Sequence, residues 1–376
     1  MPESYYDWAK GKGVTRREFL KFCTAMAAML GLESTAIPKI ATALETKPRI
    51  PVIYLNLQEC TCCSESLIRS GHPLASDLIL NMLSIDYMEV LQAAAGEQAE
   101  AALNKTMTDS YGQYLLVVEG SPTLGNDGVF CTIAGKTSES LLKECAKGAI
   151  AVVAFGSCAV NACIQGSYPN PTHAVPVHEV IKDKPVIKVP GCPPIAEVIT
   201  GTIVHYLTFG SLPELTNQGR PKAFYQHRIH DNCNRRAFFD AGQFVEAFGD
   251  EGARQGWCLY KMGCKGPTTY NACAITQWNE GLSYPIKSGH PCLGCSEDHY
   301  WDQGPLYTHL AHVPSMAMGN NPDKIGLVAM GAAAAGVAVH AAATAVISKS
   351  KEKKDSKDIA GSNEKIPPSN PNDVNL

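Results

Sequence analysis

Three cysteines, Cys60, Cys62 and Cys63, stand within four positions of one another. A largely apolar run at residues 54–57 precedes them and favours a β-strand, and the Ser-Glu pair at 64–65 is suited to open a helix by capping its free N–H groups. Thiolates are soft ligands that select iron–sulfur clusters, zinc or copper. A strand-to-helix turn that carries three of them is therefore expected to hold a soft metal centre.

The chain contains fifteen cysteines in 376 residues. Disulfide-rich secreted scaffolds are small because they cannot bury a sufficient core, whereas this chain is long enough to do so. The short spacings between the cysteines therefore favour metal or cluster ligation over disulfides. A net charge of −4 with interspersed signs argues against a nucleic-acid partner.

Four short apolar runs are typical of buried parallel strands. They lie at residues 52–57, 114–119, 149–155 and 186–189. Helical patterns such as 96–110 lie between them. The alternation of strand and helix predicts a doubly wound, flavodoxin-like α/β domain, for which we expect the boundaries 44–210.

Each of these runs ends at residues that could do chemistry. Together the four ends carry six cysteines and one carboxylate: Cys60, Cys62, Cys63, Cys158, Cys163, Cys192 and Glu119. Because ligands bind beyond the carboxyl ends of parallel strands, we expect these groups to meet at one edge of the sheet. Glycines beside Cys158 and Cys192 would let the backbone approach a cluster closely.

Buried structural cysteines are the alternative reading for any one of these residues. That reading is weak for all of them, since every one follows a strand. Cys131 and Cys145 do not follow this pattern, so we interpret both as structural.

A second set of candidate ligands follows a turn-rich boundary at 209–221. It comprises His230, Cys233, Cys258, Cys264, Cys273, Cys292 and Cys295. One site with three cysteines and a histidine would suit tetrahedral zinc. Two sites, one of them with only three cysteines, favour iron–sulfur clusters instead. His290 is a candidate fourth ligand that keeps zinc open. We expect these residues to form a smaller, irregular domain over 211–312.

Residues 1–43 contain the three parts of an export signal in their usual order. A twin-arginine motif at 15–21 (TRREFLK) precedes an apolar run at 22–32, and Ala-Thr-Ala at 41–43 is a small-residue cleavage site. The alternative is an amphipathic surface helix with a chance Arg-Arg pair. The twin-arginine route carries folded, cofactor-loaded proteins out of the bacterial cytoplasm, so thiols can bind metal before they meet an oxidising compartment. Cys23 lies inside this signal and is expected to have no function.

Residues 325–348 are mostly small and apolar. As a helix they would extend about 36 Å, enough to span a bilayer. The lysines that follow should stay cytoplasmic, which places the globular part outside, in the periplasm of an inner membrane. We expect a basic, disordered tail at 349–376. His340 within the span would face a haem-bearing cytochrome or bond to another helix.

Four motifs together resemble the small subunit of membrane-bound NiFe uptake hydrogenases. They are ECTCCSES at 59–66, VPGCPP at 189–194, HDNC at 230–233 and GCKGPTTYNAC at 263–273. The similarity runs from the export signal through the C-terminal helix. The joint pattern is specific, although none of its parts would be alone.

The resemblance implies three iron–sulfur clusters in a row. The proximal cluster would use Cys60, Cys63, Cys158 and Cys192; the medial 3Fe-4S cluster Cys273, Cys292 and Cys295; and the distal 4Fe-4S cluster His230, Cys233, Cys258 and Cys264. Three medial cysteines are then sufficient, because a cluster that lacks one iron needs one ligand fewer.

Cys62 and Cys163 indicate which type within this family the chain resembles. Oxygen-sensitive members have glycine at both positions, whereas members with cysteine at both resemble the dioxygen-tolerant type, whose proximal centre is a six-cysteine 4Fe-3S cluster. The resemblance implies that in the most oxidised state of this cluster the backbone nitrogen of Cys63 binds iron, with Glu119 as a candidate extra ligand. An ordinary 4Fe-4S cluster is the alternative. Residues 159–162 (AVNA) depart from the family and leave the packing around this cluster open.

The implied function is that of an electron-transfer subunit with no catalytic residue of its own. Electrons from dihydrogen oxidation at a NiFe large subunit would pass through the three clusters to a membrane cytochrome b and quinone. This chain and the large subunit would form a heterodimer, and two heterodimers could pair. One alternative is an exported, membrane-anchored binding protein stabilised by zinc or disulfides. Another is the related cluster subunit of respiratory complex I, whose family lacks the export signal and the second cysteine domain.

Overall fold

The computed structural model describes residues 4–11, 13–29, 32–46, 49–71, 73–302, 304–310 and 322–361. It divides into two units, and a parallel five-stranded sheet forms the centre of the larger one. In spatial order its strands are β2 (Leu83–Met88), β1 (Ile50–Asn56), β3 (Tyr114–Glu119), β6 (Ala149–Phe155) and β7 (Val186–Val189). All neighbouring pairs are parallel. This is the flavodoxin-like order, so the predicted fold class is confirmed.

Strand β2 is the one member of the sheet that the sequence did not reveal. Its residues read LSIDYM, and a charged Asp86 interrupts the apolar pattern. It lies at the edge of the sheet, where one side of the strand is unpaired and partly exposed side chains are tolerated.

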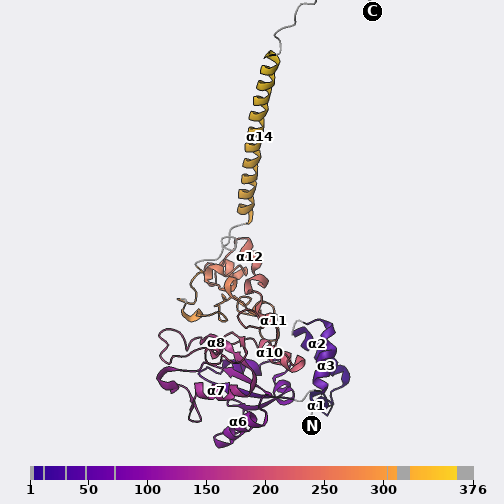
Figure 1. The fold of residues 1–376 in the computed structure, drawn as a ribbon, viewed down its shortest axis with the longest axis vertical. Coiled ribbons are helices and arrows are strands. Elements are labelled where there is room, and N and C mark those ends of the chain that lie inside the picture. The colour runs from indigo at the N-terminus through magenta and orange to yellow at the C-terminus, as the bar shows by residue number, and fades with distance from the viewer. Residues whose placement is uncertain are drawn as a thin grey trace, which may run out of the picture. The chain divides into compact units, whose positions relative to one another are not determined.

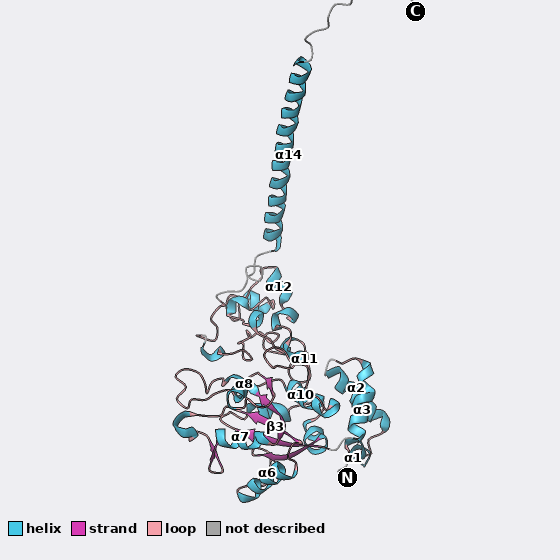
Figure 2. Ribbon diagram, in the orientation of Figure 1, coloured by secondary structure: helices cyan, strands magenta, loops and turns pink. Residues whose placement is uncertain are grey.

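Helices cover both faces of the sheet, as Figures 1 and 2 show. One face packs on α6 (Glu97–Asp109) and α7 (Ser138–Lys147), and the other on α4 (Cys62–Ile68) and α10 (Ala196–Phe209). Alternate residues of β3 enter the two cores, Leu116 on one side and Val117 on the other. Burial on both faces explains why the predicted strands are continuously apolar.

Several short elements join these helices and strands. They are α5 (Ala75–Asp77), η2 (Leu78–Met82), η3 (Gly125–Gly128), β4 (Thr132–Ile133), β5 (Lys136–Thr137), α8 (Gly156–Asn161) and α9 (Val177–Val180). Cys131 immediately precedes β4 and Cys145 is buried in α7, away from the strand ends.

The N-terminal residues form α1 (Tyr5–Gly11), α2 (Arg16–Met29), η1 (Ser34–Ala36) and α3 (Ile37–Thr46). The twin arginines begin α2. Phe19 of α2 and Ile40 of α3 are buried in the same core as Ile203 of α10. That this segment is a cleavable export signal stays a prediction.

Beyond α10 the chain has little regular structure. Its elements are α11 (Lys222–Tyr225), η4 (Ile229–Asn232), α12 (Arg236–Asp240), α13 (Glu251–Arg254), η5 (Tyr260–Met262), η6 (Gly266–Thr268), η7 (Ala272–Ala274) and η8 (Tyr300–Asp302). A small core containing Val245, Leu259 and Ile286 also includes Cys264 and Cys292. So small an apolar core is typical of domains that need metal or cluster ligation to be stable.

Helix α14 (Pro322–Gly361) belongs to the second unit, residues 318–376. It is long and apolar enough to cross a membrane over Val328–Lys353, with mean hydropathy 1.7. The predicted spanning helix is therefore present, a few residues later than expected.

The prediction of a disordered tail is wrong for residues 349–361, because α14 continues to Gly361. Lysine, the commonest residue in this part, is a good helix former, and no proline interrupts it before Pro367. Residues 362–376 lie outside the described part of the chain.

Candidate functional site

The carboxyl edge of the sheet brings the six cysteines of the first set together. Cys60, Cys62 and Cys63 follow β1; Cys158 and Cys163 follow β6; Cys192 follows β7. Electrostatic or hydrogen-bond interactions link the side chains of Cys60, Cys62, Cys63 and Cys192, and also those of Cys158, Cys163 and Cys192. Cys192 thus connects the two groups.

Burial makes this edge unfavourable for free thiolates. It raises the pKa of Cys60 to about 11 and that of Cys63 well above its usual value. The pKa of Cys163 is raised to about 11 by its hydrogen bond with Cys158 and by burial. Thiolates can therefore persist here only when a cation neutralises them, which is what bound iron does.

Glu119, at the end of the central strand, binds the cysteine-rich turn. Its buried carboxylate accepts the backbone N–H groups of Cys63 and Ser64, each at 2.9 Å, and the hydroxyl of Ser64 at 2.5 Å. Tyr54 Oη donates to it at 3.0 Å and Asn56 Nδ2 at 3.3 Å. Both carboxylate oxygens of Glu119 therefore accept hydrogen bonds.

The sequence-based expectation that residues 64–65 cap the following helix is wrong. Helix α4 begins at Cys62, directly after Thr61 in a left-handed conformation (φ 64°), and the side chain of Thr61 does not cap it. The carboxylate of Glu119 occupies the capping position instead. A cap from a residue 55 or more positions away is a tertiary contact, so a local pattern does not predict it.

Gly156 shows how tightly the backbone approaches the cysteines. It has a positive φ of 83°, and a Cβ added to it would lie 2.3 Å from the Cys63 sulfur. The expected close approach beside Cys158 is therefore present. Gly191, beside Cys192, has φ 150°, and an added Cβ would lie 2.7 Å from the Cα of Pro194.

Glu59 lies next to this edge and is half buried. One of its carboxylate oxygens, Oε2, has no hydrogen-bond partner. Burial, and then the negative charge of Glu119, raises the pKa of Glu59 to about 7. A half-buried carboxyl whose pKa lies near 7 is suited to proton transfer.

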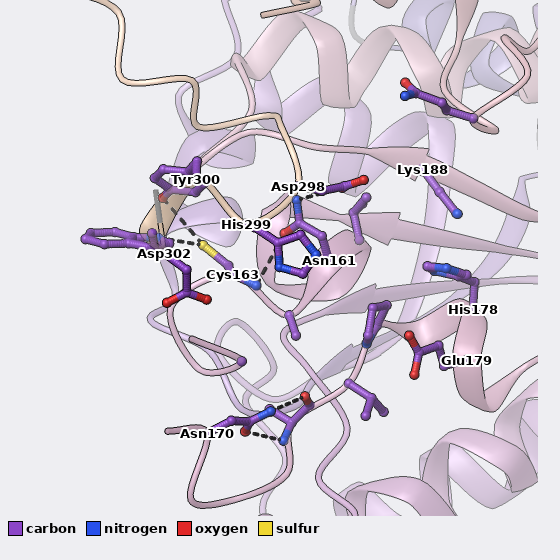
Figure 3. Close-up of a pocket in the computed structure, with 18 of the residues that line it drawn as sticks. Asn161, Cys163, Asn170, His178, Glu179, Lys188, Asp298, His299, Tyr300 and Asp302 are labelled. Atoms are coloured by element: carbon purple, nitrogen blue, oxygen red, sulfur yellow. Dashed lines mark hydrogen bonds between the residues drawn. The ribbon is translucent and has the colours of Figure 1, made fainter. Parts of the chain in front are cut away.

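Two aromatic residues that the sequence analysis did not single out contact the first cysteine set. Trp301 Nε1–H donates to the sulfur of Cys163 at 3.1 Å, and the Tyr300 hydroxyl lies 3.5 Å from the same sulfur. Figure 3 shows Tyr300 facing Cys163 at the edge of a polar cavity. Since nearly 140 positions separate these partners, no local signal could have identified them.

The cysteines of the expected medial set line one cavity of about 200 Å³. Cys273, Cys292 and Cys295 share its walls with apolar side chains such as Trp278 and Ile286. Burial raises the pKa of Cys292 well above its usual value and that of Cys295 to about 11. His290, the candidate fourth ligand for zinc, also lines the cavity but hydrogen-bonds to Tyr307 Oη at 2.9 Å.

The expected distal set, His230, Cys233, Cys258 and Cys264, lines another cavity. His230 is buried, and its Nε2 has no hydrogen-bond partner. Burial lowers the pKa of His230 to about 4, so its imidazole is neutral and keeps a free lone pair. An unpartnered buried ring nitrogen among three thiols fits a metal-ligating histidine.

Hydrogen bonds join the three ligand sets in order. The backbone N–H of Cys192 bonds to the sulfur of Cys295, which connects the first set with the second. The backbone N–H of Cys292 donates to the sulfur of Cys264 at 3.4 Å, which connects the second with the third. The sets therefore form one continuous series.

Lys265 is buried between the second and third sets. It is 7% exposed, and its ammonium interacts electrostatically with the sulfurs of Cys264 and Cys292. It donates to the carbonyl of Thr308, and within the described residues it forms no ion pair with a carboxylate. A buried cation without a carboxylate fits a neighbourhood that becomes anionic when clusters are bound.

The zinc and disulfide alternatives fit this arrangement poorly. All fifteen cysteines lie in the described part of the chain, and each is a free thiol. Among the described residues, no three His, Cys, Asp or Glu side chains are grouped so that they could hold one metal ion. A single zinc ion needs ligands about 2 Å away, whereas the ligands of a multi-iron cluster are spread more widely.

Comparison with known proteins identifies the family. The chain is 58% identical over 344 residues to the uptake hydrogenase small subunit of Azotobacter vinelandii, covering 92% of this chain and 96% of that protein. The chain belongs to the family of uptake hydrogenase small subunits. It is also 53% identical over 344 residues to the Hydrogenase-1 small chain of Escherichia coli K12, covering 92% of both.

Family models and solved structures agree with this membership. Residues 225–308 match the model for the C-terminal part of the NiFe/NiFeSe hydrogenase small subunit, and residues 60–206 match "NADH ubiquinone oxidoreductase, 20 Kd subunit". The reduced, active NiFeSe hydrogenase from Desulfomicrobium baculatum has a similar chain, with TM-score 0.65 and 31% identity over 70% of this chain and 100% of that one. The first of the two family matches separates this hydrogenase subunit from the complex I alternative.

We predict that Gly156→Ala removes the first cluster, whereas Gly135→Ala does not. Both glycines have φ near 80°, so each substitution costs roughly 1–2 kcal/mol of backbone strain. Only at Gly156 would the new Cβ also collide with a cysteine sulfur, since nothing lies within 4 Å at Gly135. Iron content and the EPR spectrum of the purified complex measure the effect. Equal iron content in the two variants would contradict the close-approach argument.

We predict that Lys265→Met shifts the second and third centres to lower reduction potentials, because removal of a buried positive charge favours the oxidised, less negative clusters. Lys265→Arg keeps the charge and is the matched control. EPR-monitored redox titration is the measurement. Unchanged potentials in Lys265→Met would show that the charge does not act on these centres.

Proposed function

We propose that this hydrogenase small subunit passes electrons, from its NiFe large-subunit partner towards the membrane, through a proximal, a medial 3Fe-4S and a distal 4Fe-4S centre in that order. The observation that carries this proposal is the unbroken series of three ligand sets, each joined to the next by a hydrogen bond from a ligand residue's backbone to a ligand sulfur. When bound, iron–sulfur clusters supply one-electron redox chemistry. Hydrogen bonds, charge and burial from this chain set their potentials.

The proximal centre would be held by Cys60, Cys62, Cys63, Cys158, Cys163 and Cys192 as a six-cysteine 4Fe-3S cluster. The position of Glu119 supports this assignment, because its carboxylate already accepts the N–H of Cys63 at 2.9 Å. It is therefore placed to take up a proton from that amide, or to offer an oxygen ligand, when the site is oxidised. An additional anionic donor stabilises the more oxidised state.

In the medial and distal sites the protein's residues act by binding and by excluding water. Cys273, Cys292 and Cys295 would hold the medial centre in an apolar cavity. His230, Cys233, Cys258 and Cys264 would hold the distal centre, with neutral His230 offering Nε2. No residue of this chain is proposed to be catalytic, because dihydrogen is split in the large subunit.

The membrane arrangement follows from charge and length. Helix α14 has a single lysine, Lys324, before its apolar part, and lysines at 349, 351, 353, 354 and 357 after it. The more basic end stays cytoplasmic, which puts the clusters in the periplasm after export by the twin-arginine route. A membrane cytochrome b that reduces quinone is the proposed electron acceptor, with His340 a candidate contact, and two such heterodimers could pair.

We predict that replacing Cys62 and Cys163 with glycine leaves dihydrogen oxidation nearly unchanged under anoxic conditions but abolishes it in air. The other four proximal cysteines still hold a cluster, but one with fewer thiolates cannot supply as many electrons to reduce attacking dioxygen. Dihydrogen consumption by the purified complex, measured with and without dioxygen, tests this. Full activity in air would show that these two cysteines do not confer tolerance.

We predict that His230→Gln slows electron transfer to the membrane acceptor several-fold and leaves the proximal spectrum unchanged, because His230 belongs to the distal set alone. His227→Gln, three positions away and exposed, is the control. Quinone reduction by membranes that contain the complex is the readout. A rate equal to that of the control would count against the distal assignment.

A further inference from the structure

We propose that Tyr300 and Trp301 are positioning residues that hold the sulfur of Cys163 by hydrogen bonds and raise the reduction potential of the proximal centre. The proposal rests on the proposed function, since it requires that Cys163 is a cluster ligand. It assigns a role to side chains of the second domain at a site that the first domain was expected to build alone.

The geometry commits both side chains to sulfur. Trp301 Nε1–H donates to Cys163 Sγ at 3.1 Å, and the Tyr300 hydroxyl lies 3.5 Å from the same atom and also hydrogen-bonds to the sulfur of Cys192. Within the described residues, neither the indole N–H nor the phenol has another hydrogen-bond partner. The Tyr300 phenol therefore contacts two cysteines of the set, Cys163 and Cys192, and the Trp301 indole contacts Cys163.

Tyr300 and Trp301 belong to η8, and contacts on both sides fix that segment to the loop that carries Cys163. Asn161 Nδ2 donates to the carbonyl of Glu297 at 3.1 Å, and the N–H of Tyr168 donates to Asp302 Oδ1 at 3.1 Å. The segment that carries the aromatic pair is therefore held on both sides against the loop that carries Cys163.

The loop itself needs such support. Ala162 and Cys163 both have positive φ values, 61° and 44°, which are unfavourable for residues other than glycine. Unfavourable conformations of this kind persist only when surrounding contacts impose them. Two contacts act directly on the Cys163 side chain: the Trp301 N–H donates to its sulfur, and its thiol donates to the Tyr300 hydroxyl, which becomes the donor once Cys163 is a thiolate ligand.

The surroundings explain why the donors matter electrostatically. Cys163, Tyr300 and Trp301 line a cavity of about 450 Å³ that also contains polar and charged groups, among them Asp298 and His299. Water there would otherwise compete for the sulfur. Because Tyr300 and Cys163 are buried, hydrogen bonds between them act in a medium of low dielectric constant and are stronger than the water contacts that they replace.

A donor to a thiolate favours the more negative, reduced state of a cluster. Tyr300 and Trp301 should therefore raise the proximal potential, and removing either donor should lower it. They stand only five and six positions after Cys295, a proposed medial ligand, so one segment binds the medial centre and tunes the proximal one.

Tyr300→Phe and Trp301→Phe in the complete heterodimer test the proposal. Each removes the donor and keeps a ring; Tyr168→Phe, at a side chain that is 91% exposed, is the matched control. EPR-monitored redox titration should show the proximal transitions shifted to lower potential in both variants, with unchanged iron content and unchanged medial and distal potentials. The control should titrate like the wild type. Proximal potentials equal to the control in both variants would overturn the inference.

Cys163→Gly separates this inference from the proposed function. If Cys163 is a ligand, its replacement changes the proximal EPR spectrum, and adding Trp301→Phe to that variant produces little further shift because the acceptor is gone. If the proximal spectrum of Cys163→Gly equals that of the wild type, the six-cysteine assignment and the inference both fail. If the spectrum changes while Tyr300→Phe and Trp301→Phe leave the potential unchanged, only the inference fails.

Discussion

The buried carboxylate of Glu119 is the interaction on which the cysteine-rich edge depends. It ends the central strand β3 and binds the first N–H groups of α4, so it ties the turn that carries three cysteines to the middle of the sheet. A carboxylate in this position is tolerable only because every oxygen is satisfied by donors. The same contact places a carboxylate oxygen 2.9 Å from the amide nitrogen of Cys63.

A second constraint joins the two parts of the larger unit. Ser157, next to Cys158, donates its hydroxyl to the carbonyl of Cys295, and the backbone N–H of Cys192 bonds to the sulfur of that residue. The buried Arg220 forms an ion pair with Glu297 at 3.2 Å, close to these contacts. If these residues bind clusters as proposed, these bonds make the ligand geometry of one centre depend on that of the next.

The sequence alone was sufficient to predict those structural features that depend on a local pattern of residues. The buried parallel strands follow from continuous apolar runs, and the meeting of Cys60, Cys158 and Cys192 follows from the rule that strand ends share an edge. What could not be predicted depends on distant contacts. The cap of α4 comes from Glu119, and the donors to Cys163 come from the far end of the second domain. Strand β2 was missed because an edge position permits a mixed pattern.

The most direct test of the account is a redox titration of the purified wild-type heterodimer, followed by EPR. If the three ligand sets hold three iron–sulfur clusters, the titration resolves three centres, and the proximal one passes through two successive one-electron steps, as expected for six thiolates with a carboxylate beside the Cys63 amide. Fewer than three centres, or zinc in place of iron in either part of the larger unit, would contradict the central claim.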